Sequence, residues 1–386
     1  MQGFFQIRFF SPELRIFLAR FLFFPSRNAD ISSLVTVMTW KMTIRSAPAI
    51  ILIAAFASAL YAQDGIDPVV AELREGDLIV STTPVTLPLP IHTAGEDHQF
   101  EAVYPPLVHV EFPLSGYMYG FDFELIDSTG QSVPRAVLHH FNLIDPAHRE
   151  MFLPIARRVF AAGQETEPVK MPKTLMGIPF EAGDTFVLSA MLHNKTDRAY
   201  KGVSLVVRIN FVKTGLPWPL ATVVPFQMDT LFPTGDKSFD LPPGESVWSW
   251  EGQPVTEGRI VALGGHMHQF STRLFLEDVT LGKVVWAGLP EYDERGELLR
   301  ITRGEYYGSI GILLDPDHTY RVTAEYDNTS DEIVPAGGMG VIAGIVIPTD
   351  PDFGFHANEA DSLYNIDYSH FMRESMSMNS DLENQH

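Results

Sequence analysis

Histidine and methionine are the residues of this chain whose types and settings could bind a metal. The chain contains 13 histidines and no cysteine, which excludes blue-copper centres, cysteine-ligated zinc and iron–sulfur clusters. A metal site here must therefore use imidazole, thioether or carboxylate ligands. Four segments place such residues in or beside apolar runs, and these are LHHFNLID, MLHNKT, GGHMHQF and VPAGGMGVIAG.

The segment GGHMHQF carries two histidines at alternate positions. In an extended strand residues i and i+2 point to the same face, so His266 and His268 can reach one metal ion while Met267 faces away. The same pattern also fits two ordinary surface or core imidazoles. The segment alone leaves both interpretations open.

The other three segments are weaker when each is taken alone. Neighbouring residues of a regular strand point to opposite faces, so His139 and His140 can share an ion if the strand is twisted or bulged there or if the two rings present different nitrogens. Otherwise they are a buried histidine beside an exposed one. A single His193 fits a strand end, and a single Met339 between glycines fits core packing.

The elements that must position these residues are predicted to be strands. Short segments rich in β-branched and aromatic residues recur along the chain, and turn-forming segments such as DSTGQS, PTGDKS and LPPGES separate them. No long amphipathic helix interrupts this pattern. It predicts an all-β protein built from sandwiches or jelly rolls.

The length of 386 residues, 45% of them hydrophobic, suggests two such units. Three prolines in KTGLPWPLATVVP interrupt the strand pattern, so we expect an N-terminal domain at 63–224 and a C-terminal domain at 225–350. Residues 351–386 are polar and acidic and are predicted to form a flexible tail. The chain has no cysteine, and we expect it to be exported, as argued below. It must therefore be stabilised by a substantial hydrophobic core rather than by disulfides.

The N-terminal residues resemble a targeting segment. Residues 42–62 combine a short cationic start with an apolar run of about 13 residues, which is typical of a cleaved signal peptide and too short to span a bilayer. Residues 1–41 are interpreted as a gene-model extension. We therefore expect export to the periplasm or the extracellular space, without stable membrane insertion.

The charge balance limits the partners. The chain has 48 acidic and 27 basic residues, a net charge of −21, which argues against nucleic acid as a partner. Small neutral or cationic molecules remain open. The sequence does not determine an oligomeric state.

Taken in order, the four segments resemble the copper type II, ascorbate-dependent monooxygenases, the family of peptidylglycine alpha-hydroxylating monooxygenase and dopamine beta-monooxygenase. The resemblance runs from about residue 113 to residue 348. It includes the flanking segments GVSLVVRINFV, LPPGESV, LGKVVW and YDNTSDEIVPAGGMG. It implies two antiparallel jelly-roll β-sandwich domains that face each other across a solvent-filled cleft.

The resemblance also implies two copper ions. The six ligands that it implies are, in chain order, His139, His140, His193, His266, His268 and Met339. The copper of the second domain, held by two histidines and a thioether that favours Cu(I), would meet dioxygen and act on a substrate C–H bond. The three-histidine copper of the first domain would store an electron delivered by an external reductant such as ascorbate.

Three positions depart from the peptide-hydroxylating members of that family. Where those members anchor a substrate carboxylate with an arginine and with polar groups, this chain has Gly264, Val341 and Ala343. A peptidylglycine substrate is therefore not expected, and a less polar small molecule is favoured. Two other functions remain open. One is non-catalytic copper storage or trafficking on the same scaffold, and the other is a β-sandwich module that binds carbohydrate or protein.

Overall fold

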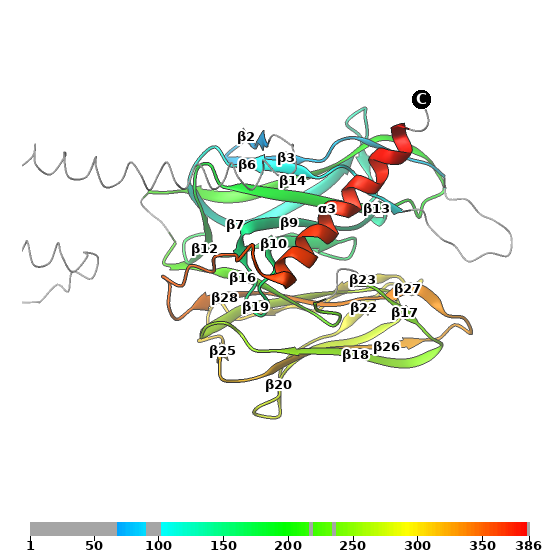
Figure 1. Ribbon diagram of the computed structural model, residues 1–386. Coiled ribbons are helices and arrows are strands. Elements are labelled where there is room, and N and C mark those ends of the chain that lie inside the picture. Colours follow the sequence, from blue (N-terminus) through cyan, green and yellow to red (C-terminus); the bar gives the residue numbers. More distant parts are fainter. Residues whose placement is uncertain (1–67, 90–101, 216–218, 234–236, 384–386) are drawn as a thin grey trace, which may run out of the picture. The chain divides into compact units, whose positions relative to one another are not determined.

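The computed structural model describes residues 68–89, 102–215, 219–233 and 237–383, all within one compact unit, Ile66–His386. The predicted extension, residues 1–41, and the predicted signal peptide, residues 42–62, lie outside the described residues. The described chain is almost entirely β, as predicted (Figure 1). Its strands form two groups of sheets, one before and one after residue 223.

The first group is a sandwich of two sheets. One sheet has the order β1 (Val69–Val70), β6 (Val108–Glu111), β13 (Thr185–His193), β9 (Leu138–Arg149) and β10 (Ala156–Gly163), with β5 (Ala102–Val103) beside β13. The other has the order β15 (Ala221–Thr222), β12 (Met176–Phe180), β7 (Gly116–Ile126), β14 (Tyr200–Lys213), β3 (Asp77–Ser81) and β2 (Glu72–Arg74). Three short strands border this second sheet, namely β4 (Val85–Leu87), β8 (Ser132–Val133) and β11 (Val169–Lys170).

The second group repeats the sandwich arrangement. Its first sheet has the order β16 (Val224–Asp229), β28 (Gly340–Pro348), β19 (Gly258–Met267) and β24 (Gly304–Glu305), with β25 (Ile312–Leu314) also beside β19. Its second has the order β18 (Gly244–Gly252), β26 (Tyr320–Asn328), β20 (Ser271–Asp278) and β21 (Lys283–Gly288). Two small ribbons complete it, β17 (Phe239–Leu241) with β27 (Val334–Gly338) and β22 (Pro290–Tyr292) with β23 (Leu298–Ile301).

Nearly all strand pairs are antiparallel, and the exceptions are the short pairs β1–β6 and β12–β15. The hydrophobic core divides with the sheets. One cluster of buried side chains runs from Ala71 to Val223, and the other begins at Val224. Each cluster also takes residues from the other half, Val261 in the first and Met151 in the second. The predicted boundary after residue 224 lies close to this division but stays a prediction, because all described residues belong to one compact unit.

The expectation of a flexible C-terminal tail is wrong for the described residues beyond 350. Helix α3 (Ser362–Glu383) follows the last strand and packs against β10 (Figure 1). Tyr364, Phe371 and Met372 are at most 4% exposed and share a core with Ile144 and Val187. Their spacing of seven and eight residues places them on one helix face, a periodicity hidden by the polar composition of the segment.

Candidate metal centre

The two adjacent histidines lie at an irregularity in β9. Leu138 is paired with Leu192 of β13 and His140 with Met191, so the register leaves His139 without an opposite residue. This is a β-bulge, which turns a side chain away from the regular alternation. The imidazole rings of His139 and His140 consequently lie with their centroids 4.9 Å apart. The bulge that two neighbouring histidines would need in order to approach one ion is present.

His193 joins this pair from the end of β13. Its ring centroid lies 4.6 Å from that of His139, with the two ring planes 26° apart. Burial, followed by the nearby imidazoles, lowers the pKa of His139. Burial, Lys195 and His140 lower the pKa of His193 to about 4. These rings are therefore neutral near pH 7, which is the form that binds metals.

The rings of His139 and His193 are stacked, and that of His140 is tilted by 51° from His139. Across the described ranges, no three or more His, Asp or Glu side chains converge into a ready-made metal cage. A shared ion would require the rings of His139 and His193 to turn out of their stacked arrangement. The described part of the second sandwich brings only two histidines together, so a three-ligand site there would need a ligand of another type.

His266 and His268 lie at the end of β19 and share a face, as their spacing predicts. Their ring centroids are 5.1 Å apart with planes at 82°, whereas Met267 between them is 1% exposed in the second core. The Nε2 atoms of both rings are buried and have no hydrogen-bond partner among the described residues. Burial, and then the nearby His266, lower the pKa of His268. Two buried imidazole nitrogens are thus available as ligands.

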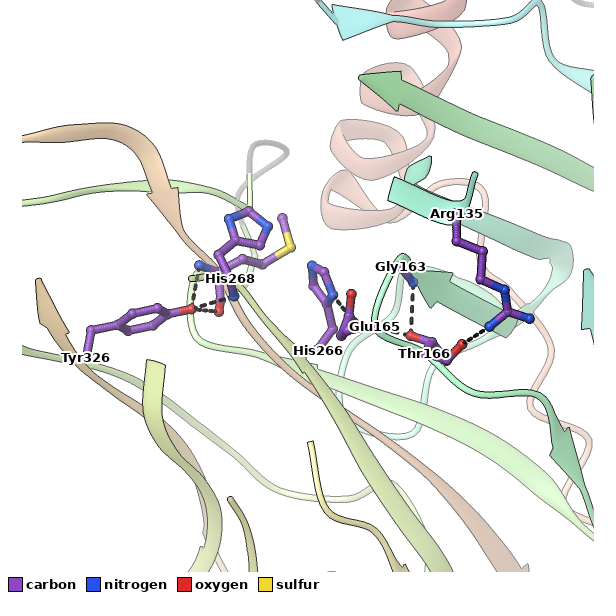
Figure 2. Close-up of polar contacts among 8 residues, drawn as sticks. Arg135, Gly163, Glu165, Thr166, His266, His268 and Tyr326 are labelled. Atoms are coloured by element: carbon purple, nitrogen blue, oxygen red, sulfur yellow. Dashed lines mark hydrogen bonds and ion pairs between the residues drawn. The ribbon is translucent and has the colours of Figure 1, made fainter. Parts of the chain in front are cut away.

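Met339 is tied to this pair by a residue that sequence reasoning missed. The hydroxyl of Tyr326 accepts hydrogen bonds from the backbone N–H groups of His268 and Met339, both at 3.1 Å, and donates to the carbonyl of Met339. Figure 2 shows this hydroxyl beside His268. Tyr326 lies 58 residues from one partner and 13 from the other, so no local pattern could have revealed it.

The glycines on both sides of Met339 have a packing reason. A Cβ atom at Gly338 would collide with the ring of Phe239, and one at Gly340 would collide with the side chains of Ala324 and Thr230. The short segment between β27 and β28 therefore lies directly against neighbouring strands. Met339 itself is 8% exposed.

A second missed residue is Glu165, in the loop after β10. Its Oε1 atom accepts a hydrogen bond from Nδ1 of His266 at 2.6 Å (Figure 2). Burial would lower the pKa of His266, but Glu165 outweighs this effect and raises it. Burial would likewise raise the pKa of Glu165, but the imidazole of His266 lowers it. In the sequence Glu165 lies in the polar segment GQETEP, which resembles any surface turn.

The two histidine groups touch each other. The ring centroid of His139 lies 5.0 Å from that of His268, so the rings form a continuous series, namely His193, His139, His268 and His266. The resemblance implied two metal positions separated by a solvent-filled cleft. The structure instead brings one histidine of each group into direct contact.

A cavity of about 630 Å³ lies beside these groups and is lined by both sandwiches. His140, His266 and Met339 border it, as do the three positions that depart from the peptide-hydroxylating pattern, Gly264, Val341 and Ala343. Much of the remaining wall is apolar and includes Phe121, Val159, Phe160, Met171 and Ile345. Its size and lining are typical of a small-molecule site.

Comparisons with known proteins add little. No protein-family model matches the chain, and no curated protein matches it. Among solved structures, the triple jelly-roll and turret assembly of an archaeal virus has 7% identity and a TM-score of 0.16, with 71% of this chain covering 60% of that one. The Sputnik virophage structure has 9% identity and a TM-score of 0.23, covering 80% of this chain and 95% of that one. Likenesses this low carry no argument about function.

The described segments include no helix with the length and apolar character needed to cross a membrane.

Proposed function

We propose that this chain is an exported copper-dependent monooxygenase that hydroxylates a C–H bond of a small organic molecule, using dioxygen and an external reductant such as ascorbate. The observation that carries the proposal is the grouping at the end of β19. Two buried Nε2 atoms without hydrogen-bond partners among the described residues lie on a strand end that Tyr326 ties to Met339, beside an apolar cavity.

The donor set suits copper. Imidazole binds both oxidation states of copper, and a thioether favours Cu(I). His266, His268 and Met339 would hold one ion, and the three histidines of the first sandwich would hold the other. When bound, copper supplies the one-electron chemistry with dioxygen that protein side chains cannot perform.

The other residues supply binding and orientation. Charged side chains such as Arg158, Lys237 and Arg303 also line the cavity, but its largely apolar wall favours a substrate with an apolar or aromatic body. Gly264, Val341 and Ala343 line the same cavity as Met339 and offer no polar side chain to a substrate. The contact between His139 and His268 gives the two halves of the site a short connection for an electron.

Copper content is the first test. The mature chain, reconstituted with copper and desalted, is expected to retain two ions per molecule by elemental mass spectrometry. A chain that retains none contradicts both the monooxygenase and a copper carrier, and would leave a binding module as the remaining function.

Turnover separates the enzyme from the carrier. We expect oxygen uptake with ascorbate that depends on an added organic substrate, together with a product heavier by one oxygen atom. Met339→Ala should retain the three-histidine copper and lose this activity by a factor of about 100 or more. Tight copper binding without substrate-dependent uptake across a broad panel of apolar molecules would favour storage or trafficking.

A further inference from the structure

The loop between β10 and β11 brings a carboxylate of the first sandwich to a proposed ligand of the second. Glu165 is 6% exposed, and its Oε1 atom accepts the hydrogen bond from Nδ1 of His266 at 2.6 Å. The two residues are 101 positions apart in sequence. No part of the proposed ligand set requires this contact, so its role needs an explanation of its own.

The carboxylate is held in place by its own loop. The hydroxyl of Thr166 donates to Oε1 of Glu165 at 3.2 Å and accepts from the backbone N–H of Gly163 at 3.0 Å. Arg135 in turn donates to the carbonyl of Thr166 at 3.1 Å. Figure 2 shows this chain of contacts leading from Arg135 to His266. Glu165 therefore has a defined orientation before any metal binds.

Gly163 makes room for the pair. A Cβ atom at this position would collide with the carboxylate of Glu165 and lie 3.0 Å from Cε1 of His266. Any larger residue would push the carboxylate and the imidazole apart. The glycine at the end of β10 is thus explained by the contact between Glu165 and His266.

Two arginines of the second sandwich also bind the same loop. Arg303 donates to the backbone carbonyls of Glu167 and Pro168, the latter at 3.4 Å, and Arg300 lies 3.2 Å from the carboxylate of Glu167. The loop is therefore attached to both sandwiches. Its position relative to β19 is fixed by contacts that do not involve His266.

We propose that Glu165 is a positioning residue, supplied by the first sandwich, that sets the orientation of His266 and directs its Nε2 atom toward the metal. A metal-binding histidine commonly donates its second N–H to a carboxylate, which fixes the ring and its tautomer. Here Nδ1 makes that bond, and Nε2 is buried without a hydrogen-bond partner among the described residues. This inference rests on the proposed function, because the ligand role of His266 belongs to it.

Copper affinity tests the inference in the full mature chain. We expect Glu165→Ala to weaken Cu(I) binding at the thioether site about 10- to 100-fold, and Glu165→Gln to weaken it less, because the amide oxygen still accepts the hydrogen bond. Competition with a chromophoric Cu(I) chelator measures the affinity, and sulfur scattering in X-ray absorption identifies the site.

Asp278→Asn is the matched control. Asp278 is 3% exposed and its Oδ2 atom lies 2.8 Å from Nδ1 of His318, a second carboxylate–imidazole pair on β20 away from the cavity. Neutralising this carboxylate is expected to lower stability and leave copper affinity within about twofold. If Glu165→Ala and Glu165→Gln both bind Cu(I) as tightly as the wild type with unchanged ligands, the inference is wrong.

A copper-free measurement separates this inference from the proposed function. In protein with ¹⁵N-labelled histidine, the Nδ1–H of His266 should give a downfield proton resonance that Glu165→Ala removes and Asp278→Asn retains. If the wild type binds no copper, the proposed function fails, and this resonance still reports the pair. A ring orientation that is unchanged in Glu165→Ala overturns the positioning role in either case, and Glu165→Gln decides the question if the alanine variant does not fold.

Discussion

At the scale of single residues, the hydroxyl of Tyr326 joins two segments that carry proposed ligands. Tyr326 is 1% exposed, and its hydroxyl forms hydrogen bonds with the backbone of both His268 and Met339. The pairing of Met267 with Gly340 brings the His-x-His strand end close to the methionine, and the Tyr326 oxygen adds hydrogen bonds to both segments. Burial raises the pKa of Tyr326, so the hydroxyl remains neutral and can both accept and donate.

Tyr326→Phe is expected to loosen this connection. The variant leaves two buried N–H groups and one carbonyl without their partner, which should cost about 1–3 kcal/mol of the free energy of unfolding. Cu(I) binding with a sulfur ligand should weaken as well, as measured by chelator competition and X-ray absorption.

Tyr320→Phe is the corresponding control on the same strand. Tyr320 is 0% exposed, and its hydroxyl accepts from the backbone N–H of Asp315 at 2.9 Å, away from the proposed ligands. It should lose similar stability and keep the sulfur ligand. Equal copper affinity in the wild type and both variants would show that Tyr326 serves stability alone.

Asn194 and Asn328, each followed two residues later by Thr or Ser as in an N-glycosylation sequence, hold turns in place by side-chain hydrogen bonds. Asn328 is 1% exposed and donates to the carbonyls of Leu241 at 3.1 Å and Glu332 at 2.8 Å, while its oxygen accepts from Ser330. Asn194 makes the same arrangement in the first sandwich. In the folded chain both amide nitrogens are occupied by hydrogen bonds.

Asn328→Ala should therefore destabilise the protein by about 1–3 kcal/mol, because it leaves the buried carbonyl of Leu241 without its donor. Urea unfolding followed by fluorescence measures this loss. Thr329→Ala, a change of the exposed middle residue of the same turn, should alter stability by no more than about 0.5 kcal/mol. Equal unfolding midpoints for the two variants would contradict the anchoring role.

At the scale of elements, α3 supplies the counter-charge of a nearly buried arginine. Arg158 of β10 lines the cavity, and its guanidinium makes two hydrogen bonds, at 2.6 and 2.7 Å, to the carboxylate of Asp367 in α3. Both side chains are nearly buried. The helix therefore neutralises a cation at the wall of the proposed substrate site.

Asp367→Ala is expected to cost about 3–5 kcal/mol, because it leaves the guanidinium of Arg158 buried without its counter-charge. Replacing both residues by leucine should restore much of the loss, since a buried ion pair is often replaced by apolar side chains at little cost. Chemical denaturation of the two single variants and the double variant measures the coupling. Additive losses in the double variant would mean that the two residues act independently.

At the scale of the whole molecule, the two sandwiches are joined by packing rather than by disulfides. Glu150, which is fully buried, accepts hydrogen bonds from the backbone N–H of Arg158 at 2.7 Å and of Gln227 at 3.1 Å. One carboxylate thus bridges β10 of the first sandwich and β16 of the second. Contacts of this kind give a chain without cysteine the rigidity that a two-part site needs.

Burial raises the pKa of Glu150 to about 7, which makes stability depend on pH. Between the unfolded pKa near 4.5 and the folded value, the folded state holds more protons than the unfolded state, so stability falls as pH rises. Asp229, whose pKa burial raises to about 6, acts in the same direction. Glu150→Gln should remove up to about 1 kcal/mol per pH unit from this slope.

Unfolding free energies of the wild type and Glu150→Gln at pH 5, 6 and 7 measure the difference in slope. The comparison of slopes is unaffected by the constant loss that the amide itself causes. Parallel curves for the two proteins would mean that Glu150 is already ionised throughout this range.

Much of the architecture follows from the sequence, and the proposed ligand set comes from the resemblance that the four segments carry together. Alternation of apolar and polar residues is a local property of strands, so the all-β fold was predictable without knowledge of any partner. The same rule placed His266 and His268 on one face with Met267 opposite, and it indicated that a twist or bulge would let the rings of His139 and His140 approach each other.

Only the tertiary structure decided which distant groups meet. The contacts of Glu165 with His266, of Tyr326 with Met339 and of His139 with His268 join residues from different strands and loops. Periodicity reports which way a side chain points from its own strand, but not which strand lies opposite. The helix α3 was missed for a related reason, since its apolar face is narrow and becomes evident only against the core that it covers.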